Sequence, residues 1–341
     1  MAVTASSMNE SLLSRSPAMK EVAGLTLRLS NVDSTVLITG ESGTGKERIA
    51  RLLHDESARA GRAFIGINCG ALTETLLESE LFGHAKGAFT GAGLDRPGLF
   101  EAAHGGSLLL DEVGEVSPAM QVKLLRALQA REVRRVGENK SRPFDVRIIA
   151  ATNRNLAQGV ADGTFRQDLY YRLKVVELRV PPLRERREDV LPLAMELLTA
   201  AAARMNRPVV GFTQGVAEVL MRHEWPGNVR ELESAMEHGV ALARGREVEV
   251  EDLPDDVRGP VAELIRSVPA AVRTLAEVER EYIIATLEQH EGNQTRTAAA
   301  LQIGIATLYR KLKSYGLIVS RGSARNVSLV ATAPSALESR E

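Results

Sequence analysis

A glycine-rich segment at residues 40–47 reads GESGTGKE, directly after the apolar run STVLIT and directly before a helical pattern that begins at Lys46. In a strand, loop and helix arrangement of this kind, consecutive backbone N–H groups cradle phosphate oxygens, and the lysine meets the β and γ phosphates of a nucleotide. We therefore expect the following residues to bind a nucleotide: Gly40, Glu41, Ser42, Gly43, Thr44, Gly45, Lys46 and Glu47. Glu47 stands where the general pattern has a hydroxyl that ligates magnesium, so direct coordination from this position is in doubt. A turn that merely joins a strand to a helix is the alternative interpretation.

A second segment, LLLDE at residues 108–112, is an apolar strand that ends in two carboxylates. Ligands of open α/β sheets bind at the carboxyl ends of the strands, so Asp111 can hold Mg²⁺ there, usually through water. Glu112 can orient the water that attacks a γ-phosphate and take its proton. Two solvated carboxylates at a strand end are the alternative, but their coincidence with the loop at 40–47 favours nucleotide hydrolysis.

The composition is that of an ordinary folded protein: 341 residues, 44% hydrophobic and 26% charged, which is enough for two or three domains. The single cysteine, Cys69, excludes an internal disulfide framework and a cysteine-rich zinc site, and it fits a reducing compartment. The N-terminus MAVTASSMNE has no basic region followed by an apolar core, and no apolar run approaches the length of a membrane span. We therefore expect a cytoplasmic protein with no membrane partner.

The elements that must position the two segments are strands and helices in alternation. The expected strands are STVLITG, RAFIGIN, SLLLDEV, VRIIAATN and VVELRV, with helical stretches between them. This alternation predicts an α/β fold with a mostly parallel sheet that is covered on both faces. After two prolines at 181 and 182 the strand signals stop, and helical spacing predicts a second, all-helical subdomain. The expected segments are a short N-terminal segment 1–19, the α/β part 20–182, the helical part 183–257, a linker 258–272, a small helical unit 273–318 and a disordered tail 319–341.

Basic residues gather near the C-terminus, although the net charge of the chain is −1. Residues 292–326 contain no acidic side chain. The cations in this range are Arg296, Arg310, Lys311, Lys313, Arg321 and Arg325. The predicted last helix has one apolar face, made of Ile305, Leu308, Leu312 and Tyr315. Its other side carries Thr307, Arg310, Lys311 and Ser314. Such a helix can read a DNA major groove, although surface helices that bind nothing share the pattern.

Seven segments follow one another in a recognisable order. They are GESGTGKE, INCGAL at 67–72, ELFGHAKGAFTGA at 80–92, GGSLLLDE at 105–112, ATN at 151–153, FRQDLYYRL at 165–173 and WPGNVRELE at 225–233. Over residues 20–318 this order resembles the bacterial enhancer-binding proteins, the AAA+ ATPases that activate transcription by the sigma-54 form of RNA polymerase. The GAFTGA hexapeptide is specific to that family among AAA+ proteins, and Glu47 is the residue that the family usually carries at its position.

The resemblance implies an AAA+ P-loop NTPase with a parallel sheet, a helical lid subdomain and a small all-α helix-turn-helix domain. It implies ATP and Mg²⁺ as cofactors, bound between the subunits of a ring, most often a hexamer. The implied partners are the sigma-54 RNA polymerase holoenzyme and enhancer DNA.

The resemblance also implies roles for single residues. Asn153 is similar to the sensor I residue, which reaches the attacking water or the γ-phosphate, and Asn68 to the switch asparagine that holds Glu112 by a hydrogen bond. Arg166 and Arg172 resemble arginine fingers that one subunit places into its neighbour's site. Arg230 resembles sensor II, which reaches the nucleotide from the lid. Taken singly, each of these could be an exposed polar residue.

Phe89 is the one aromatic residue in the segment GAFTGA and raises a question of its own. Locally it could be tucked against the core, since the segment has neither strand nor helix periodicity. The resemblance implies that the segment is instead an arm that contacts the sigma factor through Gly87, Ala88, Phe89, Thr90, Gly91 and Ala92.

The segment TLYRKLKSYGL resembles the Fis-type helix-turn-helix that the same family carries. The implied DNA contacts are Arg296, Thr307, Arg310, Lys311 and Lys313. Two positions depart from the family pattern: Gln302 replaces the usual turn glycine, and Gly304 replaces the usual capping serine. A non-glycine residue in left-handed geometry costs about 1 kcal/mol, whereas glycine is an adequate N-cap. We therefore expect the motif to fold with a slightly altered turn.

Two other functions compete with this one. The GAFTGA segment could be the pore loop of another AAA+ remodeller, such as a helicase or an unfoldase, or the chain could be a passive DNA-binding regulator without ATPase activity. Fewer than about 35 residues precede the first expected strand, whereas family members commonly carry a sensory domain there. Control by a separate regulatory protein, control by the level of synthesis, or a truncated chain would each account for this.

Overall fold

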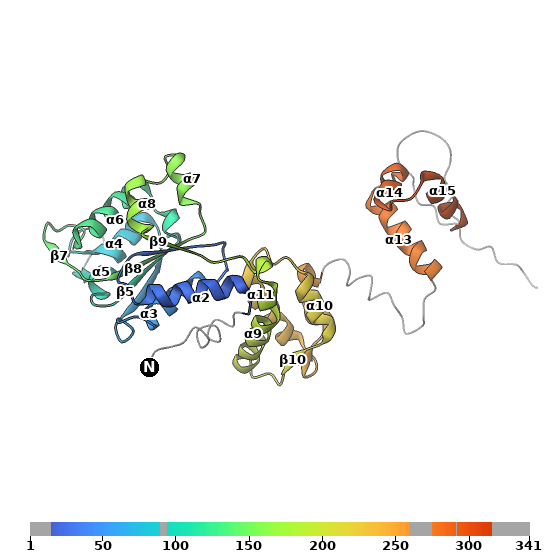
Figure 1. Ribbon diagram of the computed structural model, residues 1–341, viewed down its shortest axis with the longest axis horizontal. Helices are drawn as coiled ribbons and strands as arrows, with labels where there is room; N and C mark the ends of the chain where they lie inside the picture. The colour runs from blue at the N-terminus through green and yellow to red at the C-terminus, as the bar shows by residue number, and fades with distance from the viewer. Residues whose placement is uncertain (1–14, 89–93, 259–274, 291, 316–341) are drawn as a thin grey trace, which may run out of the picture. The chain divides into compact units, whose positions relative to one another are not determined.

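The computed structural model describes residues 15–88, 94–258, 275–290 and 292–315 (Figure 1). The chain divides into two compact units, Met1–Gly259 and Pro260–Glu341. In the described ranges, no helix is long and apolar enough to cross a membrane. The expected disordered tail 319–341 and all but the first residue of the expected linker 258–272 lie outside the described residues.

The first unit contains a five-stranded parallel sheet with the strand order β2-β5-β8-β1-β9. Its strands are β1 (Val36–Thr39), β2 (Phe64–Asn68), β5 (Ser107–Asp111), β8 (Arg147–Thr152) and β9 (Val176–Arg179). Every residue of β8 is buried, as expected for a central strand with a near-continuous apolar run. The five strands expected from the sequence and the predicted parallel sheet are therefore confirmed.

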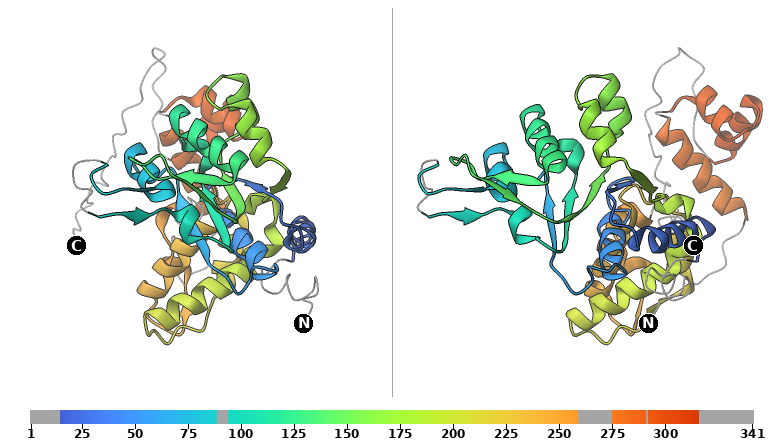
Figure 2. Two further views of the ribbon diagram at one scale, coloured as in Figure 1. Left: turned by 90° about the vertical axis from the view of Figure 1, so that its left-hand side faces the viewer. Right: turned by 60° about the vertical axis from the view of Figure 1, so that its left-hand side comes forward.

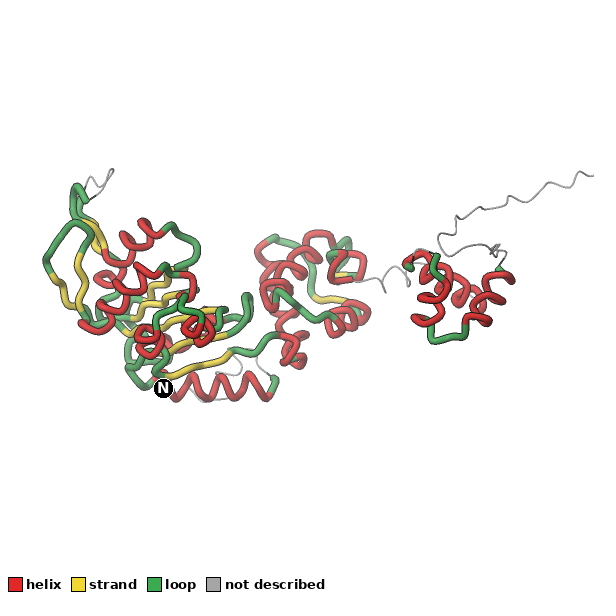
Figure 3. Tube along the Cα trace, turned by 90° about the horizontal axis from the view of Figure 1, so that it is seen from above, coloured by secondary structure: helices red, strands yellow, loops and turns green. Residues whose placement is uncertain are grey.

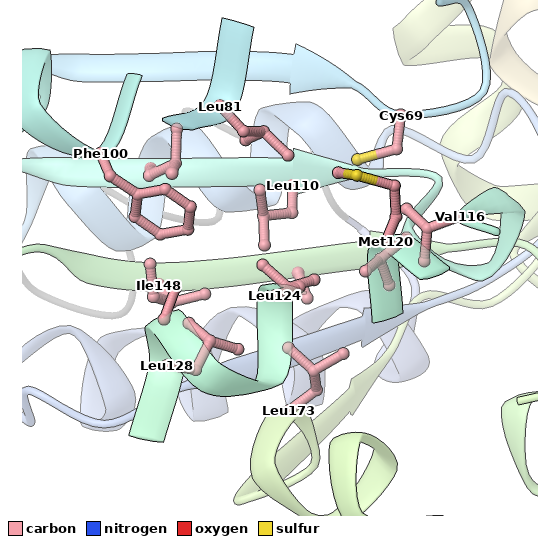
Figure 4. Packing of buried hydrophobic residues seen from close by; sticks show 14 of the residues in the cluster. Cys69, Leu81, Phe100, Leu110, Val116, Met120, Leu124, Leu128, Ile148 and Leu173 are labelled. Atoms are coloured by element: carbon pink, nitrogen blue, oxygen red, sulfur yellow. The ribbon is translucent and has the colours of Figure 1, made fainter. Parts of the chain in front are cut away.

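Helices cover both faces of this sheet, and in Figure 3 its strands lie between them. They are α2 (Pro17–Ser30), α3 (Lys46–Asp55), α4 (Glu74–Phe82), α5 (Leu99–Ala102), α6 (Pro118–Ala130), α7 (Leu156–Ala161) and α8 (Gln167–Leu173). Because successive strand residues point to opposite faces, Leu108 and Leu110 of β5 join one core and Leu109 joins the other. Figure 4 shows the first core, in which Met120, Leu124 and Leu128 of α6 face the sheet. Helix α2 starts at Pro17, ahead of the boundary expected at residue 20.

Two β-hairpins interrupt the alternation and were not expected from the sequence. One pairs β3 (Gly83–His84) with β4 (Arg96–Pro97), and the other pairs β6 (Glu132–Arg134) with β7 (Ser141–Pro143). They lie side by side, since His84 pairs with Val136 (Figure 2, right). Their strands are two or three residues long, so no apolar period marks them in the sequence.

The lid subdomain is built mainly from α9 (Val190–Arg204), α10 (Gln214–Arg222) and α11 (Asn228–Leu242). It also contains three short 3₁₀ helices, Leu183–Glu185, Arg187–Asp189 and Val250–Asp252. Trp225 anchors the turn before α11: its ring is buried and its Nε1–H donates to the Leu220 carbonyl at 2.9 Å. The expectation of an all-helical part is wrong in one detail, because β10 (Gly211–Phe212) and β11 (Glu247–Val248) form a short parallel pair. Two-residue strands leave no periodic signal.

The second unit contains three described helices, α13 (Leu275–Gln289), α14 (Gln294–Ala300) and α15 (Ile305–Ser314). Its core consists of Ile283, Ala298, Leu308 and Leu312. Gln302 has φ 52°, which confirms the expected left-handed turn, and Gly304 is the N-cap of α15. Ile305 does not belong to the buried face as expected: it is 53% exposed, because it stands on the first turn of α15, outside that core.

Candidate functional site

The carboxyl end of the sheet brings the glycine-rich loop and the two acidic residues together. The loop joins β1 to α3, and three of its glycines have positive φ: Gly40 (159°), Gly43 (76°) and Gly45 (96°). The Lys46 ammonium is buried and donates to the carbonyls of Gly40 and Glu41 at 3.0 and 3.1 Å. A cavity of about 200 Å³ opens here. Its lining is Ser42, Gly43, Gly45, Lys46, Glu47, Asp111, Glu112, Val229, Arg230 and Glu233.

Glu112 lies between the loop and the end of β8. One carboxylate oxygen, Oε1, is 3.7 Å from Lys46 Nζ, and the other accepts a hydrogen bond from the backbone N–H of Asn153 at 3.1 Å. Its backbone has φ 51°, a left-handed conformation that a non-glycine residue adopts at a cost. The structure thus brings together Lys46, Glu112 and Asn153, which are far apart in the sequence.

Asp111 is the last residue of β5, and its carboxylate accepts the backbone N–H of Glu112 at 3.0 Å. Burial and the neighbouring Glu112 carboxylate raise the pKa of Asp111 above its usual range. The ionised form would therefore be stabilised by a cation at this point. Oxygen donors of this kind suit Mg²⁺ that keeps several waters and binds phosphate oxygens. Among the described residues, no three His, Cys, Asp or Glu side chains form a group that could hold a metal ion by themselves.

The placement of Asn68 differs from the expectation. Its Nδ2 lies 3.5 Å from Asp111 Oδ2, and its Oδ1 accepts the backbone N–H groups of Gly70 and Ala71 at 2.9 and 3.1 Å. Asn68 was expected to donate a hydrogen bond to Glu112, but in the structure it donates a long one to Asp111. The reason is the strand register, which pairs Asn68 with Asp111, while the left-handed turn at Glu112 carries that side chain toward Lys46.

The lid contributes Arg230 to the cavity lining, the lid residue that the resemblance implies. The guanidinium of Arg230, on α11, donates to the Ser42 hydroxyl at 2.8 Å. A second lid contact was missed: Arg184 donates to the Glu41 carboxylate at 2.8 Å. This hydrogen bond, with a further one from Asn228, lowers the pKa of Glu41 to about 2. No sequence signal marked Arg184, which lies outside the segments that carry the resemblance.

Arg172 lies on α8, and Arg166 is the N-cap residue of that helix. Neither arginine lines this cavity. Arg166 is exposed and pairs with Asp168 at 2.7 Å, and Arg172 donates to the Leu128 carbonyl at 2.7 Å. Both guanidinium groups are held on the surface of the same subdomain, away from the cavity lining.

Of the GAFTGA segment, the structure describes Gly87, with φ 82°, and Ala88. The other four positions, Phe89, Thr90, Gly91 and Ala92, lie outside the described residues. The stem before them is held by the backbone hydrogen bond from Ala85 N–H to the Val136 carbonyl, at 2.9 Å. The second hairpin therefore supports the base of this segment.

In the C-terminal unit, the expected DNA contacts divide into two groups. Arg296, Arg310 and Lys313 are exposed, and Thr307 is partly exposed. Lys311 instead forms an ion pair of 2.7 Å with Glu279 of α13, because its position on α15 faces that helix. The charge of Lys311 is therefore paired within this unit, and its expected contact with DNA stays a prediction.

Three family descriptions match the chain: the Sigma-54 interaction domain over residues 12–179, the AAA+ ATPase lid domain over 184–266, and the Bacterial regulatory protein, Fis family, over 274–315. The chain is similar to the transcriptional regulatory protein ZraR of Klebsiella oxytoca, with 52% identity over 87% of this chain and 67% of the relative. It is also similar to the regulatory protein AtoC of Escherichia coli, with 47% identity over 90% of this chain and 68% of the relative. Among solved structures, it is similar to NtrX of Brucella abortus in complex with ATP, with 35% identity, a TM-score of 0.66, and coverage of 89% of this chain and 68% of the other. The fold, the motif order and these relatives agree: the chain belongs to the family of sigma-54-dependent transcriptional regulators, with an AAA+ P-loop NTPase fold, an AAA+ lid and a Fis-type helix-turn-helix.

Proposed function

We propose that the chain activates sigma-54-dependent transcription by hydrolysing ATP in a ring and using the hydrolysis to remodel the closed promoter complex into an open one. The observation that carries this proposal is the cavity in which Lys46, Asp111, Glu112 and the lid residue Arg230 meet. A phosphate loop, two strand-end acids and a lid arginine are the parts that phosphoryl transfer from a nucleoside triphosphate requires. The ATP complex of the relative NtrX supports ATP as the nucleotide.

The residues of the cavity then have separate tasks. Lys46 and the loop N–H groups bind the phosphates, and Arg230 binds from the lid side. Glu112 takes the proton of the attacking water, with Asn153 holding its carboxylate in place. Asp111 would hold Mg²⁺, whose positive charge would supply electrostatic stabilisation of the phosphate oxygens.

The site needs a second subunit. Developing charge on the γ-phosphate calls for an arginine, and trans-acting arginines contribute about 10³–10⁵ in rate in other nucleotide hydrolases. Arg166 and Arg172 are held away from the cavity of their own subunit, which supports a role in the site of a neighbour. In a closed ring, which in this family is a hexamer, every site receives arginines from its neighbouring subunit in the same way.

We assign the contacts with the sigma factor and with DNA to two other segments of the chain. GAFTGA would contact the sigma factor, with Phe89 as its apolar anchor and with Gly87, Ala88, Thr90, Gly91 and Ala92 as the arm. Enhancer DNA would be bound through Arg296, Thr307, Arg310 and Lys313, whose charges meet phosphates or base edges.

Binding to sigma-54 in the presence of a transition-state analogue of ATP tests the proposal. The parent protein should form a stable complex with sigma-54, whereas Phe89→Ala should keep its ATPase activity and lose the complex. A Phe89→Ala variant that melts many degrees earlier and loses ATPase activity would place Phe89 in the core and contradict the proposed role, since core Phe→Ala changes cost about 3–5 kcal/mol. Failure of the parent to bind sigma-54 under any nucleotide would overturn the function itself.

A further inference from the structure

The lid holds the phosphate loop by three successive backbone carbonyls. The Ser42 carbonyl accepts from the Asn228 side-chain amide at 3.0 Å, and the Gly43 carbonyl accepts from the Val229 N–H at 2.9 Å. The Thr44 carbonyl accepts from the Arg186 guanidinium at 2.7 Å. All three donors belong to the lid side of the chain, more than 130 residues away in sequence.

These contacts fix which way the loop N–H groups point. In a trans peptide the carbonyl and the N–H of the next residue point in opposite directions. With the carbonyls of residues 42–44 held by the lid, the N–H groups of residues 43–45 are turned the other way. Consecutive N–H groups turned to one side are what an anion-binding loop presents to phosphate. The Thr44 N–H also makes a long 3.4 Å contact with the Glu41 carbonyl, which closes the turn.

Asn228 is built into this arrangement. Its side chain is 0% exposed, its Oδ1 accepts the Leu183 N–H at 2.7 Å, and its Nδ2 also reaches Glu41 at 3.2 Å. Its backbone has φ 56°, a conformation that asparagine and glycine adopt more readily than other residues. Side-chain hydrogen bonds to both segments make Asn228 a bridge between Leu183, in the first short helix of the lid, and the loop.

The approach is close enough to require glycine in the loop. A Cβ on Gly43 would stand 2.3 Å from the Gly227 carbonyl, and Gly43 also has φ 76°. The lid and the loop are therefore in direct backbone contact, so a shift of the turn at 227–229 must move the loop.

Arg186 is a buried cation that the hydrolysis mechanism does not use. It is 4% exposed, and its Nε is a buried donor with no partner among the described residues. Burial lowers the pKa of Arg186 to about 10, against the opposing effect of Asp189. Burial of a guanidinium costs folding free energy. This cost favours a role in positioning the loop over a role in filling space in the core.

We propose that Asn228 and Arg186 are positioning residues for phosphate binding: by holding the loop carbonyls, they orient the loop N–H groups toward the phosphates of the nucleotide. The inference rests on the proposed nucleotide hydrolysis. It predicts that the lid holds the phosphate loop in its binding conformation. Loss of either side chain should therefore weaken binding of the nucleotide phosphates and leave binding of the nucleoside unchanged.

The experiment measures the affinities of the full chain for ATP, ADP and adenosine by competition against a fluorescent ADP. Asn228→Gly removes the amide at a left-handed position that glycine tolerates, and Arg186→Met removes the guanidinium at similar length. Each should lose about tenfold in affinity for ATP and ADP, the value of about one hydrogen bond to a charged or polar partner, and less than about twofold for adenosine. The matched controls are Asn206→Gly, at an exposed left-handed lid position, and Arg187→Met, at an exposed arginine next to Arg186. Both controls should bind all three ligands as the parent does.

Conservative variants cover the case in which a truncation fails to fold. Arg186→Lys keeps a charged donor and should regain most of the ATP affinity that Arg186→Met loses. Asn228→Asp keeps the acceptor for Leu183 but puts a carboxylate against Ser42 and Glu41. It should therefore lose at least as much ATP affinity as Asn228→Gly. The double variant Asn228→Gly with Arg186→Met should cost less than the sum of its parts, since both act on one loop. Equal losses for ATP and adenosine, or unchanged ATP affinity in folded variants, would overturn the inference. A parent that binds adenosine as tightly as ATP would instead overturn the proposed hydrolysis.

Discussion

Lys46 and Glu112 face each other in the nucleotide cavity, with Nζ 3.7 Å from Oε1. The same carboxylate is held on its other side by the backbone N–H of Asn153. Phosphate oxygens that take Lys46 as a partner would compete with Glu112 for the ammonium. The arrival of ATP should therefore free the carboxylate for the attacking water, which makes the base available only when its substrate is bound.

Replacement of Glu112 by glutamine should abolish turnover and keep ATP binding. The amide has nearly the same size but cannot take a proton, and general-base catalysis contributes about 10²–10⁴ in rate. Loss of the carboxylate also removes the ion pair between Lys46 and Glu112, which competes with phosphate for the ammonium, so ATP should bind at least as tightly as in the parent. Steady-state turnover and equilibrium binding measure the two effects separately. Turnover near the parent rate would exclude Glu112 as the base.

Mixed rings test the arginine fingers. Neither Arg172→Ala nor Lys46→Ala subunits alone should hydrolyse ATP, but a one-to-one mixture should recover activity, because random mixing pairs an intact loop with an intact arginine at about a quarter of the interfaces of a ring. ATPase activity measured across mixing ratios checks this, and mass analysis confirms that the rings are mixed. If no ratio restores activity in confirmed mixed rings, Arg172 does not act in trans.

The sheet and its two strand-end sites were predictable because each rests on a local pattern. The run LLLDE gives both a buried strand and two acids at its carboxyl end, and GESGTGKE gives both the loop and the helix start. The role of Asn228 was not predictable, although the residue stands in a quoted segment. Its contacts depend on a left-handed backbone and on the approach of residues 183, 186 and 42–44, which no local spacing encodes. The pairing of Lys311 with Glu279 was missed for the same reason, since it joins two helices.

Cys69 should make stability depend on pH above 9. The thiol is 3% exposed, and burial, followed by the charges of Asp111 and Glu112, raises its pKa from the usual value of 9.0 to about 12. Above pH 9 the unfolded thiol ionises while the folded one stays protonated, so the stabilisation is complete below pH 9 and is lost as pH rises toward 12. Denaturant unfolding at several pH values should show that the parent loses about 1.4 kcal/mol per pH unit more than Cys69→Ala between pH 9.5 and 11. Equal slopes for the two proteins would contradict the raised pKa.

Gln302→Gly should stabilise the C-terminal helices. Gln302 occupies a left-handed position at a cost of about 1 kcal/mol, which glycine avoids, although glycine gives back part of this gain through its freedom in the unfolded chain. We expect a net gain of about 0.5 kcal/mol, measured as a higher midpoint for the transition of this unit in calorimetry. The matched control is Gln294→Gly on helix α14, which should lower the midpoint, because glycine disfavours a helix. A lower midpoint for Gln302→Gly as well would show that the side chain, and not the backbone, determines stability at this turn.

Open-complex formation tests whether the chain couples ATP hydrolysis to promoter melting. Sigma-54 holoenzyme on a sigma-54 promoter would be incubated with a high concentration of the full chain, at which tethering to an enhancer is not needed, and promoter melting would be followed by permanganate reactivity and single-round transcripts. The proposed coupling of hydrolysis to remodelling predicts melting with the parent chain and ATP, and none with Glu112→Gln or with a non-hydrolysable ATP analogue. Melting without hydrolysis, or no melting by a parent chain that hydrolyses ATP normally, would contradict it.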